Sequence, residues 1–283
     1  MDNRKIIGVL FADEGNSGLT HNFFAGILDS FKRVVEGRGY YLAFLNCDKS
    51  RANRQTYLEQ VQKGGMEGVL IACINFEDPE VIELLNSRYP IAVIDQDIEG
   101  TISVKSDNVQ GMRDLVNYII EMGHRKIAYI KGDENTVTGI RFAGFIDTCA
   151  ENGIEIPAEY IRPGNFRDME NASYQTECLL RMENPPTCII YSDDYSAIGG
   201  RNIIRARGLH VPMDISIAGY DGIDIISQYE PRLTTVKQDT VQIGTAAADR
   251  LLDWIEQGCF DEDEKIVVKT EIIKGRTIRK IYS

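Results

Sequence analysis

The sequence predicts an α/β protein made of two doubly wound lobes, each built on a parallel sheet covered by helices. Short apolar runs alternate with helix-length amphipathic stretches along almost the whole chain, as in repeated strand–helix–strand units. Most of these runs are continuously apolar, which is expected of strands with helices on both faces. The length of 283 residues exceeds the needs of most single small domains and suits two lobes of ordinary size.

Seven apolar runs are predicted to be strands. In chain order they are KIIGVLF from Lys5, YYLAFLN from Tyr40, EGVLIACI from Glu67, PIAVID from Pro90, KIAYIKG from Lys126, TCIIYS from Thr187 and DISIAGYD from Asp214. Four of them precede Gly123 and His124 and three follow, so each set suffices for a sheet of its own.

Amphipathic helices are predicted between the strands, and the first one, which starts near His21, shows the pattern best. Its apolar residues are spaced three and four apart, at Phe24, Ile27, Leu28 and Phe31. Gly37 and Gly39 end it, since glycine is common just past the last turn of a helix.

No long Pro-rich or Gly-rich linker separates the two sets of strands, so short crossovers should join the lobes. A cleft between the lobes is then the natural ligand site, because doubly wound sheets bind ligands beyond the carboxyl ends of their strands. Polar residues follow several predicted strands at these ends: Asp13, Asp95, Asp193 and Asp221.

The charge and hydropathy of the chain exclude several classes of protein. With 31 basic and 43 acidic residues the formal net charge is −12, which repels nucleic-acid phosphates, so we do not expect this chain to bind DNA by itself. No apolar run approaches the roughly 20 residues that span a bilayer. The N-terminus has no apolar signal core, so a cytoplasmic location without membrane association is expected.

Cysteine and histidine usage gives no indication of a metal centre, a cofactor or catalysis. The six cysteines form no C-x-x-C pair, which favours a reducing compartment: Cys47, Cys73, Cys149, Cys178, Cys188 and Cys259. Only three histidines are present, and the sequence lacks a Gly-x-Ser-x-Gly elbow, a Walker loop and a His-Glu-x-x-His motif. We therefore expect a protein that is not an enzyme and that carries no cofactor.

Five segments resemble, in order, the signature segments of one bacterial family. Residues 106–132 contain an Asp, a helix and then Gly-His-basic-x-Ile-Ala leading into a strand, and residues 140–145 read Arg-x-x-Gly-Phe. Residues 192–221 contain Asp-x-x-Ala-x-Gly, Gly-x-x-Val-Pro-x-Asp-Ile-Ser and Gly-Tyr-Asp, while residues 233–239 and 271–280 are similar to the family's last crossover and C-terminal strand. Over nearly its whole length the chain thus resembles the lactose/galactose repressor (LacI/GalR) family.

The resemblance implies the periplasmic-binding-protein type I fold, which has two Rossmann-like lobes joined by three crossovers and an effector in the cleft. We expect residues 1–122 and 240–268 to form the N-terminal lobe, and residues 123–239 and 269–283 the C-terminal lobe. In this family a helix-turn-helix headpiece precedes the strand that here begins at Lys5. We expect that headpiece to be absent, so that DNA is read only through a module outside this chain, and we expect a homodimer.

Two charged residues are the main candidates for binding the effector. A sugar needs groups that accept and donate hydrogen bonds in pairs, because each buried hydroxyl left unpaired costs about 1–3 kcal/mol. Asp221 ends a predicted strand and resembles the family's effector-binding aspartate, although an N-cap role is an alternative. Arg141 matches the family's effector-contacting arginine, and its planar fork suits neighbouring hydroxyls or a carboxylate. Its alternative role is a salt bridge on a helix flank.

The same resemblance suggests further ligand contacts in the C-terminal lobe. Asp193 matches a polar position that contacts ligand, whereas Asp194 is expected to cap the next helix. Phe166 matches an aromatic position against the sugar, although it can instead fold back onto the core. Tyr191 ends a predicted strand from which its side chain reaches the cleft.

The remaining candidates lie in the first loop and beside the crossovers. In the first loop we expect Asp13, Asn22 and Phe23 to line the cleft, with Phe24 turned into the core. Asp107 and Gln238 lie beside two crossovers, where they contact ligand or form hinge hydrogen bonds. His124 follows a glycine at a helix end and is expected to serve packing or capping.

Two functions fit these features. The first is the effector-binding domain of a LacI-type transcriptional regulator, in which ligand closes the lobes and so controls a DNA-binding module. The alternative is a sugar-binding protein that serves a transporter, which would have the same fold and the same site chemistry. The cysteine usage and the closeness of the Gly-His and Val-Pro motifs favour the regulator.

Overall fold

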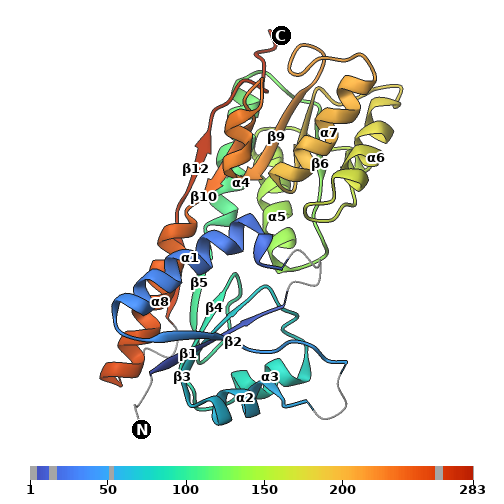
Figure 1. The fold of residues 1–283 in the computed structure, drawn as a ribbon. Helices are drawn as coiled ribbons and strands as arrows, with labels where there is room; N and C mark the ends of the chain where they lie inside the picture. The colour runs from blue at the N-terminus through green and yellow to red at the C-terminus, as the bar shows by residue number, and fades with distance from the viewer. Residues whose placement is uncertain (1–4, 13–17, 51–53, 259–263, 283) are drawn as a thin grey trace. The chain divides into compact units, whose positions relative to one another are not determined.

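The computed structural model describes residues 5–12, 18–50, 54–258 and 264–282, which divide into two compact units (Figure 1). Unit 1 consists of Met1–Ser106 and Asp239–Val268, and unit 2 consists of Asp107–Gln238 and Lys269–Ser283. The chain therefore passes three times from one unit to the other. Two α/β units joined by three crossovers are the architecture that the sequence predicts.

The described strands of unit 1 form one parallel sheet of six strands in the order β11-β5-β4-β3-β1-β2. Their bounds are β1 Ile6–Phe11, β2 Tyr41–Phe44, β3 Met66–Ala72, β4 Ile91–Ile94, β5 Ile102–Ser106 and β11 Lys265–Val268. The helices are α1 Asn22–Gly37, α2 Tyr57–Gly64, α3 Pro79–Leu85 and α8 Thr240–Gln257. Ile27 and Leu251 share one core cluster and Val61 and Val81 another, so α1 and α8 cover one face of the sheet and α2 and α3 the other.

The described strands of unit 2 also form a sheet of six, in the order β12-β10-β9-β8-β6-β7. Only the β10–β12 pair is antiparallel among the described pairs of this sheet. The strands are β6 Ile127–Ile130, β7 Ile161–Arg162, β8 Cys188–Tyr191, β9 Ser216–Asp221, β10 Thr234–Gln238 and β12 Thr270–Ile273. The helices are α4 Asn108–Glu121, α5 Thr136–Glu151, α6 Met169–Leu180 and α7 Asp194–Ala206. The core side chains of α4 and α5 pack on one face of the sheet and those of α6 and α7 on the other.

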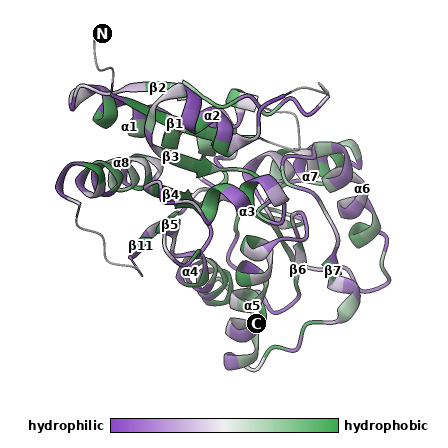
Figure 2. Cartoon of the chain, turned by 90° about the horizontal axis from the view of Figure 1, so that it is seen from below, coloured by the Kyte–Doolittle hydropathy of each residue, from purple (hydrophilic) through white to green (hydrophobic). Residues whose placement is uncertain are grey.

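The interior strands are apolar because both faces of each sheet are covered. Figure 2 shows the hydrophobic colour on β3 and β4, while much of the outer surface of the helices is hydrophilic. Every residue of β4, β6 and β8 is buried, which explains why these strands read as continuous apolar runs in the sequence.

Close contact between α1 and α8 in unit 1 depends on a small residue. A side chain at Gly244 of α8 would collide with the backbone oxygen of Ile27 and with the hydroxyl of Ser30, both on α1. The Ser30 hydroxyl donates across the contact to the carbonyl of Thr240 at 3.1 Å. The two helices therefore pack with their backbones near each other.

The boundary between the units differs from the expected one at the first crossover. We expected the N-terminal lobe to extend to residue 122, but the chain leaves unit 1 at Ser106, before α4 rather than after it. Met112 and Leu115 of α4 pack in the same core cluster as Phe145 of α5. The prediction placed α4 wrongly because β5, with the sequence ISVKS, lacks the continuous apolar run by which strands were recognised.

His124 shows how the C-terminal segment is attached to unit 2. Its side chain is completely buried, with Nδ1 2.9 Å from the Thr187 hydroxyl and Nε2 3.1 Å from the Arg279 carbonyl oxygen. Burial disfavours the charged imidazolium and lowers the pKa of His124 from 6.5 to about 4. The packing role expected of this residue agrees with these contacts.

We predict that His124 makes the protein less stable in mild acid. Below pH 6.5 the unfolded chain takes up a proton that the folded chain accepts only near pH 4, so the stabilisation present above pH 6.5 is lost as the pH falls through this window. The full loss is about 3 kcal/mol. Urea unfolding followed by circular dichroism should show a steeper loss from pH 7 to pH 4 in the wild type than in His124→Gln. Parallel pH profiles for the two proteins would contradict the prediction.

Candidate functional site

Polar side chains from several elements of unit 2 meet at the carboxyl edge of its sheet. Parallel strands end at the same edge, so the residues after β6, β8, β9 and β10 are brought together there. Six residues form what we call the Arg141 cluster: Asn108, Arg141, Phe166, Tyr220, Asp221 and Gln238. Helix α5 contributes the arginine from its second turn, and the Asn135 side chain caps this helix by accepting from the Thr138 amide at 2.9 Å.

The guanidinium of Arg141 is held in one plane by neighbours on three elements. Its Nε donates to Oδ1 of Asn108 at 2.8 Å, and Nη1 donates to the backbone oxygen of Ser192 at 3.3 Å. The ring of Tyr220 lies against it, with the ring centroid 3.7 Å from Cζ. Only 4% of Arg141 is exposed, so the site contains an enclosed cation with a fixed orientation.

Asp221 supplies the neighbouring negative charge from the end of β9. Its Oδ1 accepts from Nε2 of Gln238 at 2.7 Å and lies 3.9 Å from Nη2 of Arg141. The backbone of Asp221 has φ +98°, a conformation that residues other than glycine rarely adopt and that often marks functional sites. Three of the residues predicted to bind ligand, Arg141, Asp221 and Gln238, are therefore adjacent.

The loop that carries Phe166 is fixed by two carboxylates from neighbouring strand ends. The Phe166 amide donates to Oδ2 of Asp133 and the Arg167 amide to Oδ2 of Asp193, each at 2.9 Å. The aromatic ring packs against Gly132, where any side chain would collide with it. The centroid of the ring lies 6.0 Å from Cζ of Arg141, so Phe166, which was predicted to pack against the ligand, belongs to the cluster.

The roles expected of Asp193 and Asp194 need correction. Asp193 is the N-cap of α7, and its Oδ1 accepts from the Ser196 amide at 2.9 Å. Its Oδ2 accepts from the hydroxyls of Ser196 and Ser192 at 2.8 and 3.0 Å. The carboxylate of Asp193 is thus occupied by the protein's own donors, and the capping role expected of Asp194 belongs to Asp193.

Two aromatic residues predicted to face the ligand lie in the cores instead. Tyr191 is fully buried, and its hydroxyl is hydrogen-bonded to that of Thr176 at 2.8 Å. Side chains alternate along a strand, so Tyr191 points away from the cluster of Ile190 and into the core beneath α6 and α7. Phe23 is 7% exposed and continues the i, i+4 stripe of Ile27 in unit 1. Phe24, which we expected in the core, is only partly buried.

The other predicted residues lie outside the Arg141 cluster. Asn22 is the exposed first residue of α1 in unit 1. Asp107 is the N-cap of α4 and accepts from the Gln110 amide at 3.0 Å. Asp13 lies outside the described residues.

Asn108 and Tyr220 are the members of the cluster that the sequence analysis missed. Each directly adjoins a residue that it did single out, Asp107 or Asp221. The burial of Asn108 in the first turn of α4, where its amide needs a partner, is visible only in the structure. In unit 1, Asp95 follows β4 with φ +62°, so the strand end noted in the sequence has a left-handed backbone there as well.

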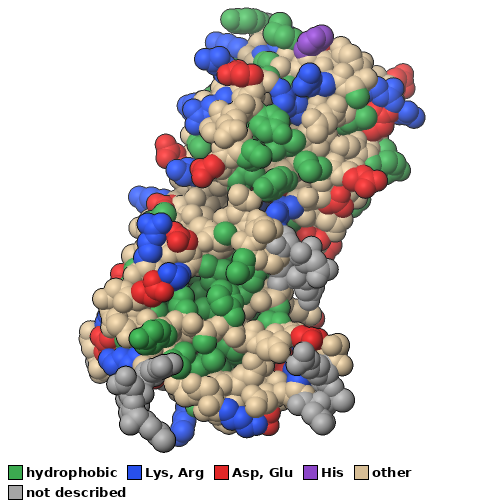
Figure 3. Space-filling view, in the orientation of Figure 1, with side chains coloured by type: hydrophobic (Ala, Val, Ile, Leu, Met, Phe, Trp, Pro, Cys, Tyr) green, Lys and Arg blue, Asp and Glu red, His purple; other side chains and the backbone are tan. Residues whose placement is uncertain are grey.

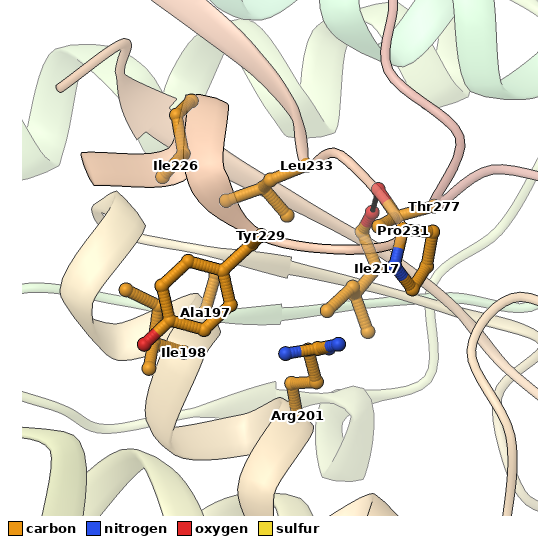
Figure 4. A pocket seen from close by; sticks show the side chains of 9 residues that line it. All are labelled: Ala197, Ile198, Arg201, Ile217, Ile226, Tyr229, Pro231, Leu233 and Thr277. Carbon is orange, nitrogen blue, oxygen red and sulfur yellow. Dashed lines mark hydrogen bonds between the residues drawn. The ribbon is translucent and has the colours of Figure 1, made fainter. Parts of the chain in front are cut away.

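Two hollows in unit 2 lie away from the cluster. One is lined mainly by apolar side chains, with Arg201 and Tyr229 near each other at its wall (Figure 4). At about 10 Å³ it holds at most one water molecule, so it is not an effector site. The other is an open groove of about 840 Å³ along α4 and β12, lined by residues such as Asp114, Tyr118, Glu271 and Lys274.

The described residues give no sign of a metal centre or a membrane anchor. No group of His, Cys, Asp and Glu among them is arranged to hold a metal ion. None of the helices within the described ranges is both long and apolar enough to cross a bilayer. The five described cysteines are free thiols, and Cys259 lies outside the described residues.

Two doubly wound units linked by three crossovers, with paired polar groups at the strand ends of one, define a two-lobed binding protein of the periplasmic-binding-protein type. Residues 116–278 match the family described as periplasmic binding protein-like domain. The chain is 30% identical to the probable HTH-type transcriptional repressor ExuR of Bacillus subtilis, over 99% of this chain and 83% of that protein. These two matches, together with the LacI family structure from Chloroflexus aggregans described below, show that this chain belongs to the LacI family of transcriptional regulators.

Solved structures share the fold. A regulatory protein of the LacI family from Chloroflexus aggregans superposes with a TM-score of 0.85 at 25% identity, covering 96% of this chain and 98% of that one. A LacI family regulator from Enterococcus faecium with bound ribose has a TM-score of 0.82 at 23% identity, covering 98% and 100%. A complex of the regulator CelR with cellobiose has a TM-score of 0.81 at 23% identity, covering 98% and 86%.

We predict that Tyr191→Phe lowers stability without affecting ligand binding. The change removes one buried hydrogen bond to Thr176, which still donates to the Ala172 carbonyl, so unfolding should cost about 1 kcal/mol less. Urea unfolding measures the stability and calorimetric titration the affinity. Weaker ligand binding with unchanged stability would show that Tyr191 contacts the ligand.

Proposed function

We propose that this chain is the ligand-sensing part of a bacterial transcriptional regulator, and that it binds a sugar or related small polar ligand at the Arg141 cluster. The observation that carries the proposal is the enclosed guanidinium of Arg141, oriented by Asn108 and Tyr220, with Asp221 and Gln238 beside it. A structural ion pair alone would not need an arginine held so rigidly on three sides. Such rigidity is what a site gains when it must orient a ligand without reorganising.

The donors and acceptors of the cluster suit a polyhydroxylated ligand. The side-chain Oε1 of Gln238 is buried and has no hydrogen-bond partner among the described residues, so it is available to a ligand hydroxyl. Arg141 supplies donors and Asp221 supplies acceptors next to it. The half-buried ring of Phe166 offers an apolar face of the kind that packs against sugar CH groups. The ribose and cellobiose on proteins of the same fold support this ligand class.

The relatives support a regulator rather than a transporter component or an enzyme. The curated relative that covers 99% of this chain is a probable transcriptional repressor. As part of the proposal we place the protein in the cytoplasm and assign the reading of DNA to a helix-turn-helix module separate from these 283 residues. Ligand would change the arrangement of the two units and so control that module, which small-angle X-ray scattering with and without ligand would test.

A homodimer is part of the same proposal. Tyr41 and Phe44 of the edge strand β2 are 62% and 51% exposed, and apolar side chains also reach the surface elsewhere, as Figure 3 shows. Exposed aromatic residues on an edge strand favour contact with another chain. The mass measured in solution by light scattering would test it.

The ligand class is tested by a thermal-shift screen of pentoses, hexoses, disaccharides, sugar acids and nucleobases. We predict that a sugar or polyol raises the melting temperature, because a ligand that binds only the folded state adds ~2.7 kcal/mol at 100 times its Kd. Arg141→Lys, screened in parallel, should show a much smaller shift with the same compound. Stabilisation by nucleobases alone would reject the sugar assignment.

We predict that Arg141→Lys and Asp221→Asn each weaken binding of that sugar by roughly a hundredfold. An ammonium cannot present the planar fork, and a neutral amide loses charge-assisted hydrogen bonds of about 1.5–3 kcal/mol each. Arg141 is more enclosed than a residue lining an open cleft, so Arg141→Ala should also lose stability and is the poorer test. Arg125→Lys is the matched control, because the Arg125 guanidinium donates to backbone oxygens near the end of α4. Calorimetric titration decides, and unchanged affinity in Arg141→Lys would rule out the site.

We predict that the 283-residue chain gives no specific retardation of DNA from its own locus at physiological salt. The net charge of −12 opposes contact with phosphates, and the longer described helices all contribute side chains to the cores of the two units. Gel shifts with the operator region and with an unrelated duplex of the same length measure it. Sequence-specific retardation would show that this chain itself reads DNA.

A further inference from the structure

Asp194 has a completely buried carboxyl group next to the turn that follows Asp221 of the Arg141 cluster. It is the first residue of α7, and its exposed fraction is 0%. Oδ1 accepts from the Thr235 hydroxyl at 2.6 Å, and Oδ2 accepts from the backbone amide of Ile223 at 2.9 Å. No Lys, Arg or His is paired with it among the described ion pairs of unit 2.

Such a group is costly to bury, and the surrounding sequence makes room for it. Burial raises the pKa of Asp194 well above its usual value, the nearby charge of Asp221 raises it further, and the two hydrogen bonds oppose the rise. In the adjacent strand β9, any side chain at Gly219 would collide with Oδ1 of Asp194. An apolar residue here would leave the Ile223 amide and the Thr235 hydroxyl without their acceptor, so the acid does more than fill space in the core.

The hydrogen bond between Asp194 and the Ile223 amide holds a strained turn that contains Asp221, one of the proposed ligand-binding residues. Asp221 and Gly222 both have left-handed backbones, with φ +98° and +70°, and at Ile223 the chain returns to φ −65° and ψ 149°. Gly222 also packs against Lys237 too closely for any side chain. The turn is therefore anchored at its end, one residue beyond Gly222, by the hydrogen bond that the Ile223 amide donates to Asp194.

We propose that Asp194 is a positioning residue, which holds the turn 221–223 so that the carboxylate of Asp221 faces Arg141 and Gln238. The inference rests on the proposed function, because it concerns the same binding site. Asp194 itself is sealed from any ligand and acts only through Asp221. The conformation of Asp221 thus depends on a bond made by a residue on another element, 27 positions earlier in the chain.

Packing alone offers a competing explanation. The side chain of Ile223 is 8% exposed and belongs to the core cluster with Ile226, so hydrophobic contacts also restrain the turn. If these contacts suffice, removal of the Asp194 bond lowers stability but leaves Asp221 in place. The two explanations differ in whether the Asp221 carboxylate moves relative to the Arg141 guanidinium.

The test compares Asp194→Leu with Thr277→Val as a matched control. Leucine keeps nearly the shape of the side chain but has no oxygen to accept from the Ile223 amide or the Thr235 hydroxyl. The control removes a fully buried hydroxyl that also makes two backbone hydrogen bonds in unit 2, to Thr234 and Ile217 at the other end of β10 and β9. If Asp194→Leu does not fold, Asp194→Ala replaces it, since it removes the same two acceptor oxygens and adds no bulk against Gly219.

A first measurement needs no ligand. The Nε–Hε resonance of Arg141 in NMR, assigned by its loss in Arg141→Lys, reports on the position of Asp221. In Asp194→Leu we expect it to move in the same direction as in Asp221→Asn, and we expect amide exchange at residues 221–223 to rise about tenfold or more. Thr277→Val should change neither. An unmoved Arg141 resonance overturns the proposal even if exchange rises, because loss of the Ile223 hydrogen bond by itself speeds exchange there.

A second measurement uses ligand. Wild type and variants are titrated calorimetrically with D-ribose, with cellobiose and with the panel sugar that gives the largest melting shift. We expect Asp194→Leu to bind about tenfold or more weakly, while Thr277→Val binds as the wild type does. Equal losses in both variants overturn the proposal. If the wild type binds no sugar, the proposed function fails, and the Arg141 resonance still decides whether Asp194 positions Asp221.

Discussion

The organisation of unit 2 around its strand ends depends on one enclosed cation. Only 4% of Arg141 is exposed, so the elements around its guanidinium have to supply acceptors for it at fixed places. Helix α4 provides Asn108, the backbone after β8 provides an oxygen, and β9 provides both the Tyr220 ring and the Asp221 charge. Four elements are thereby brought into register at one point, which is the precision that ligand recognition needs.

Three aspartate side chains fix the loops around that point, each by accepting a hydrogen bond from a backbone amide. Asp133 and Asp193 hold the Phe166 loop, and Asp194 holds the turn after β9. An amide in a loop has no strand or helix partner, and a carboxylate is a strong acceptor for it. Asp133 and Asp193, as ionised acceptors, account for part of the acidic excess that the composition shows.

The predictions from sequence succeeded where a physical pattern was local and failed where it depended on the direction of a side chain. Continuous apolar runs identified the interior strands, because burial on both faces leaves no polar positions. The strand β5 escaped notice because polar residues are buried in it. The resemblance to a family predicted Arg141 and Asp221 as effector contacts, and the structure places them next to each other. Gln238, for which the sequence left a ligand contact and a hinge hydrogen bond open, lies beside Asp221.

Asp193 and Asp194 illustrate the limit of this approach. The two adjacent acids differ by a 100° step around a helix start, and only coordinates show which of them caps the helix and which enters the core. Tyr191 and Phe23 failed for the same reason, since a strand end and a first helical turn each allow two directions. A contact such as that of Asn108 with Arg141 joins residues 33 positions apart, which no local pattern encodes.

The three crossovers also constrain when the protein can fold on the ribosome. Unit 1 obtains α8, which fills one face of its sheet with Ile243 and Leu251, and its edge strand β11 only from residues after Asp239. Unit 2 obtains β12 later still, from Thr270 onward. Neither sheet is complete until the last part of the chain has been synthesised, so the nascent protein carries two unfinished cores at once. A stop codon before Val268 would therefore damage both units together, rather than releasing one intact domain.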